Sequence, residues 1–248
     1  MAHRHPVLVA SALIFAVVAA VSGRAQVRNR QPGIRLFHVF NCRTDDPRQG
    51  RLLEQLQAPL RQLVADRLTL CARYEPSLPP AADPDKKVIV EARRQLERAI
   101  VVFLGRPDLG GEAAAFAREA PLSYEWEGFP EGPMMEAAYA DDYLHRHEST
   151  ELKPYLQLFL LYRYRAAYEA ATWSAANPPI DAHLDQVLPR WQEVGRHAAD
   201  EYARVWADVQ RNGDTLTKAV ADDLDRDDPL YVGPAGHPRR GRGLRSTR

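Results

Sequence analysis

The sequence lacks a net charge, a long apolar run and any recognisable catalytic motif. Its 33 Lys and Arg residues balance its 33 Asp and Glu residues, so no overall field favours nucleic acid or an anionic membrane as a partner. No Gly-x-Ser-x-Gly elbow, His-Glu-x-x-His pair or glycine-rich phosphate loop occurs. These absences argue against the commonest hydrolase, zinc-protease and nucleotide-binding classes, and we expect no cofactor.

A run of about 20 apolar residues, the length that spans a bilayer, is also missing. The longest apolar run, from Val7 to Val21, is shorter and is broken by Ser11. It follows a basic start and precedes small residues that end at Ala25, which is the three-part pattern of a secretory signal. We therefore predict that residues 1–25 are a cleaved signal peptide and that the mature chain has no transmembrane span. An uncleaved anchor and a buried helix are the alternatives for this segment.

Lysine is scarce, since only four of the 33 basic residues are Lys and the rest are Arg. Together with abundant Ala, this composition favours a GC-rich genome, and we expect a bacterial one. Loss of the signal removes Arg4 and Arg24 and leaves 31 basic residues against 33 acidic ones. We expect a nearly neutral exported protein in the periplasm or outside the cell.

Cysteine occurs only twice, at Cys42 and Cys71. In an oxidising compartment an even number of cysteines favours a disulfide, and we expect these two to form one. The alternative is a buried free thiol, because Cys71 lies on the apolar side of its predicted helix.

Strand-like composition is confined to one run, Ile34–Phe40, within a lead-in of residues 26–45 that we expect to be extended. This run predicts at most one short strand, or an extended segment packed on helices. Elsewhere, apolar residues recur at helical spacing as far as residue 228. The sequence thus predicts a single all-α domain over residues 46–228, either an irregular antiparallel bundle or a stack of αα-hairpins. Residues 229–248, rich in Arg and Gly, are expected to be disordered.

Local signals divide this domain into about seven helices. Asp46-Pro47 and Asp83-Pro84 are typical helix starts, and Gly105 is a typical helix end. Pro59 should kink or split the first helix, because proline removes an amide donor and clashes with the preceding turn. We expect helices over residues 46–74, 83–105, 111–119, 133–147, 151–174, 181–212 and 214–224.

The least regular segment, Pro121–Pro133, alternates aromatic and acidic residues among Gly and Pro. Aromatic rings held by such turns make a rigid contact surface, and neighbouring carboxylates favour cationic or hydroxylated ligands. The alternative is that the rings close the end of the core. The candidates for a ligand or partner surface are Tyr124, Trp126, Glu127, Phe129 and Glu131.

A metal site is an alternative on two later helices. A carboxylate and an imidazole three or four residues apart lie on one helix face, and two such helices can hold a metal between them. The spacing departs from the Glu-x-x-His pattern of di-iron bundles, and solvated ion pairs explain the same residues. No metal is favoured; the alternative ligands are Asp141, Asp142, His145, Glu193 and His197.

Arginine occurs in two unusual places. Arg163 and Arg165 lie in the most apolar predicted helix, where a guanidinium needs a partner such as Glu169, four residues beyond Arg165. We expect a structural ion pair there, with an anion site as the alternative. The Arg residues of the tail follow a domain that is not basic, so nucleic acid is not expected as a partner.

The sequence therefore favours an exported helical binding or scaffold module that acts in the cell envelope or outside the cell. Its partner is expected to be another envelope or extracellular protein, or a small ligand. The alternative is an exported enzyme of unrecognised type, with or without metal assistance.

Overall fold

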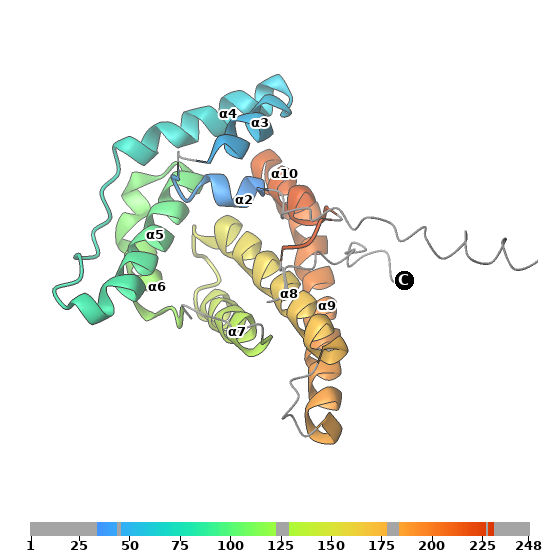
Figure 1. Ribbon diagram of the computed structural model, residues 1–248. Helices are drawn as coiled ribbons and strands as arrows, with labels where there is room; N and C mark the ends of the chain where they lie inside the picture. Colours follow the sequence, from blue (N-terminus) through green and yellow to red (C-terminus); the bar gives the residue numbers. More distant parts are fainter. Residues whose placement is uncertain (1–33, 44–45, 123–128, 178–183, 227, 231–248) are drawn as a thin grey trace, which may run out of the picture. The chain divides into compact units, whose positions relative to one another are not determined.

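The computed structural model describes residues 34–43, 46–122, 129–177, 184–226 and 228–230 (Figure 1). The chain divides into two units, residues 1–30 and residues 31–248, and every described residue belongs to the second unit. The predicted signal peptide therefore lies outside the described residues.

The regular structure of the described residues is entirely helical, which confirms the predicted all-α fold. The described residues form nine α-helices where about seven were predicted, because Pro59 splits the first one and an additional helix precedes it. Three short 3-10 helices lie at residues 69–72, 84–86 and 107–109. The α-helices are α2 (Leu36–Val39), α3 (Pro47–Glu54), α4 (Ala58–Leu68), α5 (Lys87–Leu104), α6 (Gly110–Glu119), α7 (Glu131–Arg146), α8 (Lys153–Ala176), α9 (Leu184–Asn212) and α10 (Thr215–Leu224).

The ends of several helices follow the local signals of the sequence. The Asp46 carboxylate accepts a hydrogen bond from the backbone N–H of Arg48 and caps α3. Asp214 caps α10 in the same way through the N–H of Thr217. Helix α5 ends at Gly105, whose φ of 66° lies in the left-handed region that glycine adopts without strain.

The run predicted as a strand or an extended segment, Ile34–Phe40, is instead a helical turn, α2. Its apolar side chains are almost all buried, so the composition reflects burial rather than pairing with a strand. A helical turn satisfies buried backbone groups locally, which a lone strand cannot do. The N–H of Leu36 at the start of α2 donates to the Asp223 carboxylate at 2.6 Å. The expectation of an extended segment is thus wrong for these residues.

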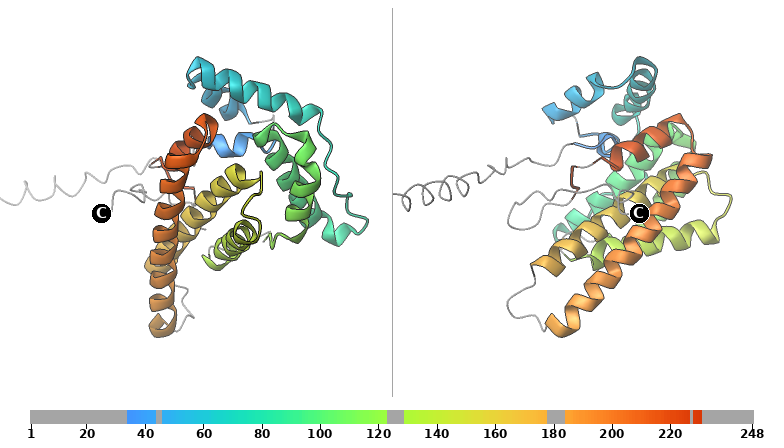
Figure 2. Two further views of the ribbon diagram at one scale, coloured as in Figure 1. Left: turned by 180° about the vertical axis from the view of Figure 1, so that it is seen from behind. Right: turned by 90° about the vertical axis from the view of Figure 1, so that its right-hand side faces the viewer.

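Helix α8 occupies the centre of the described unit, between α7 and α9 (Figures 1 and 2). Leu156, Leu158 and Leu161 point in different directions around it, yet all three are buried. The prediction that this helix is central is therefore confirmed. Even α8 contains Arg163 and Arg165, and no helix among the described residues is both long and apolar enough to cross a membrane.

Cys42 and Cys71 form the predicted disulfide, with their Cα atoms 5.4 Å apart. The bond closes a loop that contains α3 and α4, because it links the segment before α3 to the 3-10 helix that follows α4. Cys42 has a φ of 57°, a left-handed conformation that is unfavourable for a residue with a side chain. We infer that the disulfide helps to hold the backbone in this conformation.

The described chain continues beyond the predicted start of the tail at residue 229. Pro229 is buried, and Leu230 packs against the hydrophobic core. The fold therefore holds the chain two residues further than the sequence indicated, and residues 231–248 lie outside the described residues.

Candidate functional site

The structure describes only part of the predicted aromatic-acidic surface. Tyr124, Trp126 and Glu127 lie outside the described residues, whereas Phe129 and Glu131 lie at the start of α7. The expectation that Trp126 packs inward as the anchor of this segment therefore stays a prediction.

Phe129 and Glu131, at the N-terminal end of α7, contact residues in the first half of α9. The Phe129 ring is 36 % exposed, and its centroid lies 6.1 Å from the ring of Trp191. The Glu131 carboxylate lies 3.6 Å from the Arg190 guanidinium. Met135, one helical turn after Glu131, is 52 % exposed. Two large apolar side chains therefore face solvent near a carboxylate.

The five residues of the metal alternative do not come together. Asp142 is exposed, Glu193 and His197 are exposed on α9, and Asp141 and His145 line a separate pocket. Among the described residues, no three His, Cys, Asp or Glu side chains are placed to hold a metal ion. Because protein metal centres of these ligand types usually need three or four side chains, the geometry gives the metal-assisted alternative no support.

The pocket has a volume of about 180 Å³ and lies where the end of α7, the start of α8 and the second half of α9 meet. Each of the three helices contributes one apolar side chain to its wall, namely Leu144, Leu160 and Val205. The titratable side chains of the lining carry both signs of charge: Asp141, His145, Glu148, Lys153, Arg204 and Asp208.

Hydrogen bonds fix several of these polar side chains. The Arg204 guanidinium donates to Asp141 at 3.1 Å, and the amide nitrogen of the buried Gln157 donates to Asp208 at 2.6 Å. His145 Nδ1 lies 2.9 Å from the backbone carbonyl oxygen of Asp141. Because a carbonyl oxygen only accepts, Nδ1 is the donor of this hydrogen bond. The pocket is thus a preformed polar site.

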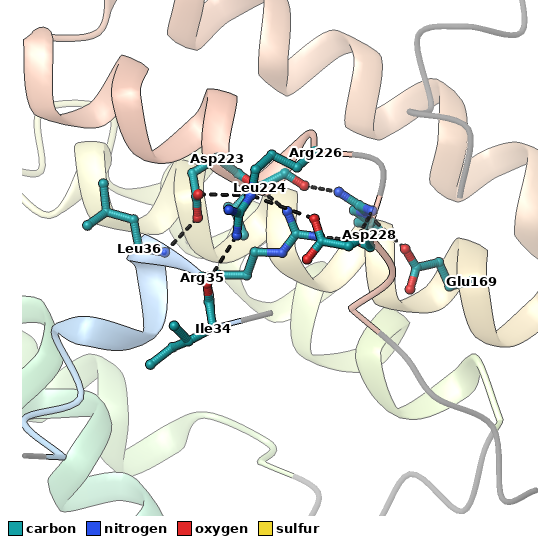
Figure 3. Close-up of polar contacts among 9 residues, drawn as sticks. Ile34, Arg35, Leu36, Glu169, Asp223, Leu224, Arg226 and Asp228 are labelled. Atoms are coloured by element: carbon teal, nitrogen blue, oxygen red, sulfur yellow. Dashed lines mark hydrogen bonds and ion pairs between the residues drawn. The ribbon is translucent and has the colours of Figure 1, made fainter. Parts of the chain in front are cut away.

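A second polar cluster, built on two buried arginines, joins the two ends of the described unit (Figure 3). Arg35 and Arg165 are 1 % and 3 % exposed. Arg35 donates to the backbone carbonyls of Asp223 and Asp228, and it lies 3.2 Å from the Asp228 carboxylate. Arg165 donates to Glu169 at 2.9 Å and to the Asp228 carbonyl at 2.8 Å. The expected structural ion pair of Arg165 and Glu169 is confirmed.

The electrostatics of this cluster show the cost of burying charge. Burial, followed by repulsion from Arg165, lowers the pKa of Arg35 to about 10. Burial also raises the pKa of the Asp223 carboxyl, against the opposing effects of the Leu36 N–H and the Arg226 guanidinium. Both arginines are held by carbonyls and carboxylates of the chain itself, so this cluster serves to attach the N-terminal and C-terminal segments to α8.

Sequence reasoning did not identify Glu148, in the connector between α7 and α8, nor four further polar residues of the pocket: Lys153, Gln157, Arg204 and Asp208. The last four come from two helices, and only the packing of α8 against α9 brings them together. One signal was available in the sequence, because Gln157 is an uncharged polar residue within the most apolar helix.

Comparison with known proteins found no family model, no curated protein and no solved structure that matches the chain. The function must therefore be argued from the residues of this chain alone.

Proposed function

We propose that this chain is an exported helical binding module that contacts another envelope or extracellular protein through the surface of Phe129 and Met135. The signal-like residues 1–25 support export. The Cys42–Cys71 disulfide supports it as well, because such bonds persist mainly in oxidising compartments. The lack of a recognisable catalytic motif in the sequence favours a contact function over an enzymatic one.

The observation on which the proposal rests is the exposure of two large apolar side chains near the start of one helix. Among the described residues, the large apolar side chains that are exposed are Phe129, Met135 and Val88. A single exposed apolar residue such as Val88 is ordinary, whereas two large apolar side chains exposed within six residues of each other are candidates for a contact region. Because Phe129 is 36 % and Met135 is 52 % exposed, burial of the remaining area of either side chain by a partner contributes about 0.5–1.5 kcal/mol.

The fixed position of Phe129 also favours binding. Its ring packs beside the buried Trp191, and the nearby Glu131 is paired with Arg190. A side chain that is already held in one position loses little conformational entropy when a partner covers it.

The test compares three forms of the protein, each tagged and produced in the native host. These are the parent, the double variant Phe129→Ser/Met135→Ser, and the control Val88→Ser, which removes an exposed apolar side chain from α5. After chemical cross-linking in the intact envelope, the parent and the control should capture the same partner. The double variant should lose it while circular dichroism shows that it remains folded; its melting temperature should fall somewhat, because Phe129 packs on Trp191. Equal capture by all three forms would refute the proposal.

Export is tested separately by the intact mass of the protein recovered from the periplasm or the medium. The chain should begin at or near Gln26 and should contain no free thiol. A full-length mass in the membrane fraction would contradict export and would leave the surface of Phe129 and Met135 to be tested by itself.

A further inference from the structure

The pocket between α7, α8 and α9 is separate from the surface of Phe129 and Met135 and has a different chemistry. Each of the three helices contributes one apolar side chain to its wall, and the other lining side chains are polar or charged. This combination is typical of a small-ligand site, in which apolar walls exclude water and a few polar groups fix the orientation of the ligand.

Most of the charges in the pocket are already satisfied by the protein. Asp141 pairs with Arg204, and Asp208 accepts hydrogen bonds from Gln157 and from Asn212 at 2.6 Å each. These groups are therefore held in place before any ligand arrives. Because these charges are already paired, the groups can orient a ligand but do not attract one by an excess of charge.

Two opposite charges on the pocket lining have no such partner. Within the described residues, the side chains of Glu148 and Lys153 form neither a hydrogen bond nor an ion pair. They also do not pair with each other, although only four residues separate them along the chain. An anionic ligand would satisfy only Lys153, and a cationic ligand would satisfy only Glu148.

From this arrangement we propose that the pocket binds a small zwitterion, an α-amino acid or a betaine, with its carboxylate toward Lys153 and its cationic nitrogen toward Glu148. The partly exposed Leu144 then contacts the carbon atoms of the ligand, and the buried Leu160 and Val205 form the floor of the pocket behind it. The volume of about 180 Å³ suits a ligand of this size, because a cavity of about 150 Å³ holds one benzene molecule. Exposed charges contribute modestly, so the expected dissociation constant is about 1 mM.

The experiment uses L-valine together with two analogues that each lack one of its charges. Isovalerate keeps the carboxylate and the carbon skeleton, and isobutylamine keeps the ammonium group. Glycine betaine and L-glutamate extend the set of zwitterions. Binding to the mature protein is followed by NMR chemical shifts, in particular those of the Gln157 side-chain amide, which lies in the pocket.

At least one of the three zwitterions should shift the Gln157 amide and the backbone amides around the pocket, and should bind at least about fivefold more tightly than isovalerate or isobutylamine. Lys153→Gln and Glu148→Gln should each weaken that binding about fivefold. The matched controls, Lys87→Gln and Glu54→Gln, alter exposed charges on α5 and α3 and should leave it unchanged.

Three results would overturn the proposal. One is the absence of any shift at the pocket with all three zwitterions in the folded parent protein. Another is equal binding of a singly charged analogue. The third is an equal effect of the pocket variants and the controls. None of these results depends on a protein partner. The pocket proposal can therefore be refuted without affecting the proposal for the surface of Phe129 and Met135, and that proposal can be refuted without affecting the pocket.

Discussion

Lowering the pH from 7 to 5 should destabilise the protein through one histidine, His38 on α2. Its ring is partly buried and lies 5.0 Å from the ring of Tyr162. Burial, followed by the positive charges of Arg163, Arg35 and Arg43, lowers the pKa of His38 from 6.5 to about 4. The folded protein therefore favours the neutral ring.

The sign and the size of the effect follow from proton linkage. In the unfolded chain His38 takes up a proton near pH 6.5, whereas in the folded protein it does so only near pH 4. The unfolded state thus binds more protons between these values, and stability that is present above pH 6.5 is lost as the pH falls toward 4. The linkage relation gives a loss of about 2 kcal/mol in unfolding free energy between pH 7 and pH 5.

The assay is urea unfolding followed by circular dichroism at both pH values, with the parent, His38→Gln and His197→Gln. The parent should lose about 2 kcal/mol between the two pH values. In His38→Gln most of this loss should vanish. His197 is exposed on α9, so its replacement should leave the loss unchanged. If His38→Gln loses as much stability as the parent, burial of this ring is not the cause and the reasoning fails.

Three further predictions use the same unfolding assay at pH 7. The variant Cys42→Ser/Cys71→Ser should be about 3–4 kcal/mol less stable, because it frees a loop of 29 residues; a loss near zero would contradict this. Glu97→Ala should cost about 3 kcal/mol, because this buried carboxylate accepts hydrogen bonds from Tyr74, Ser77 and Leu78 in the segment before α5. A cost near zero would show that these hydrogen bonds add no net stability. Arg165→Met should cost about 3–5 kcal/mol, because it removes the guanidinium that pairs with the buried Glu169 carboxylate. Arg165→Met/Glu169→Met should cost less, and the reverse order would contradict the buried ion pair.

Local chemistry explains why much of the fold could be predicted from the sequence. Asp46 and Asp214 cap helices through their own neighbours, and Gly105 ends a helix through its own φ. None of these features depends on distant parts of the chain. Pro59 acts equally locally, since it cannot continue the preceding helix and it starts α4.

Features that depend on distant contacts could not be predicted in this way. Helix α2 forms where the composition suggested a strand, and its first N–H is satisfied by Asp223, which lies 187 residues away in sequence. The polar pocket likewise forms only when three helices pack together. Of its lining residues, the sequence had identified only Asp141 and His145 as candidates. The unpaired charges of Glu148 and Lys153 become informative only when both are seen on the same pocket.

The most direct test of the central claim is site-specific photo-cross-linking in living cells of the native host. A photoreactive residue is placed at position 135, or at position 88 as the control, since both side chains are exposed and apolar in the parent protein. The account predicts a discrete cross-linked partner from position 135 and none from position 88. Cross-linking that is absent from both positions, or equal at both, would contradict a binding surface at the start of α7.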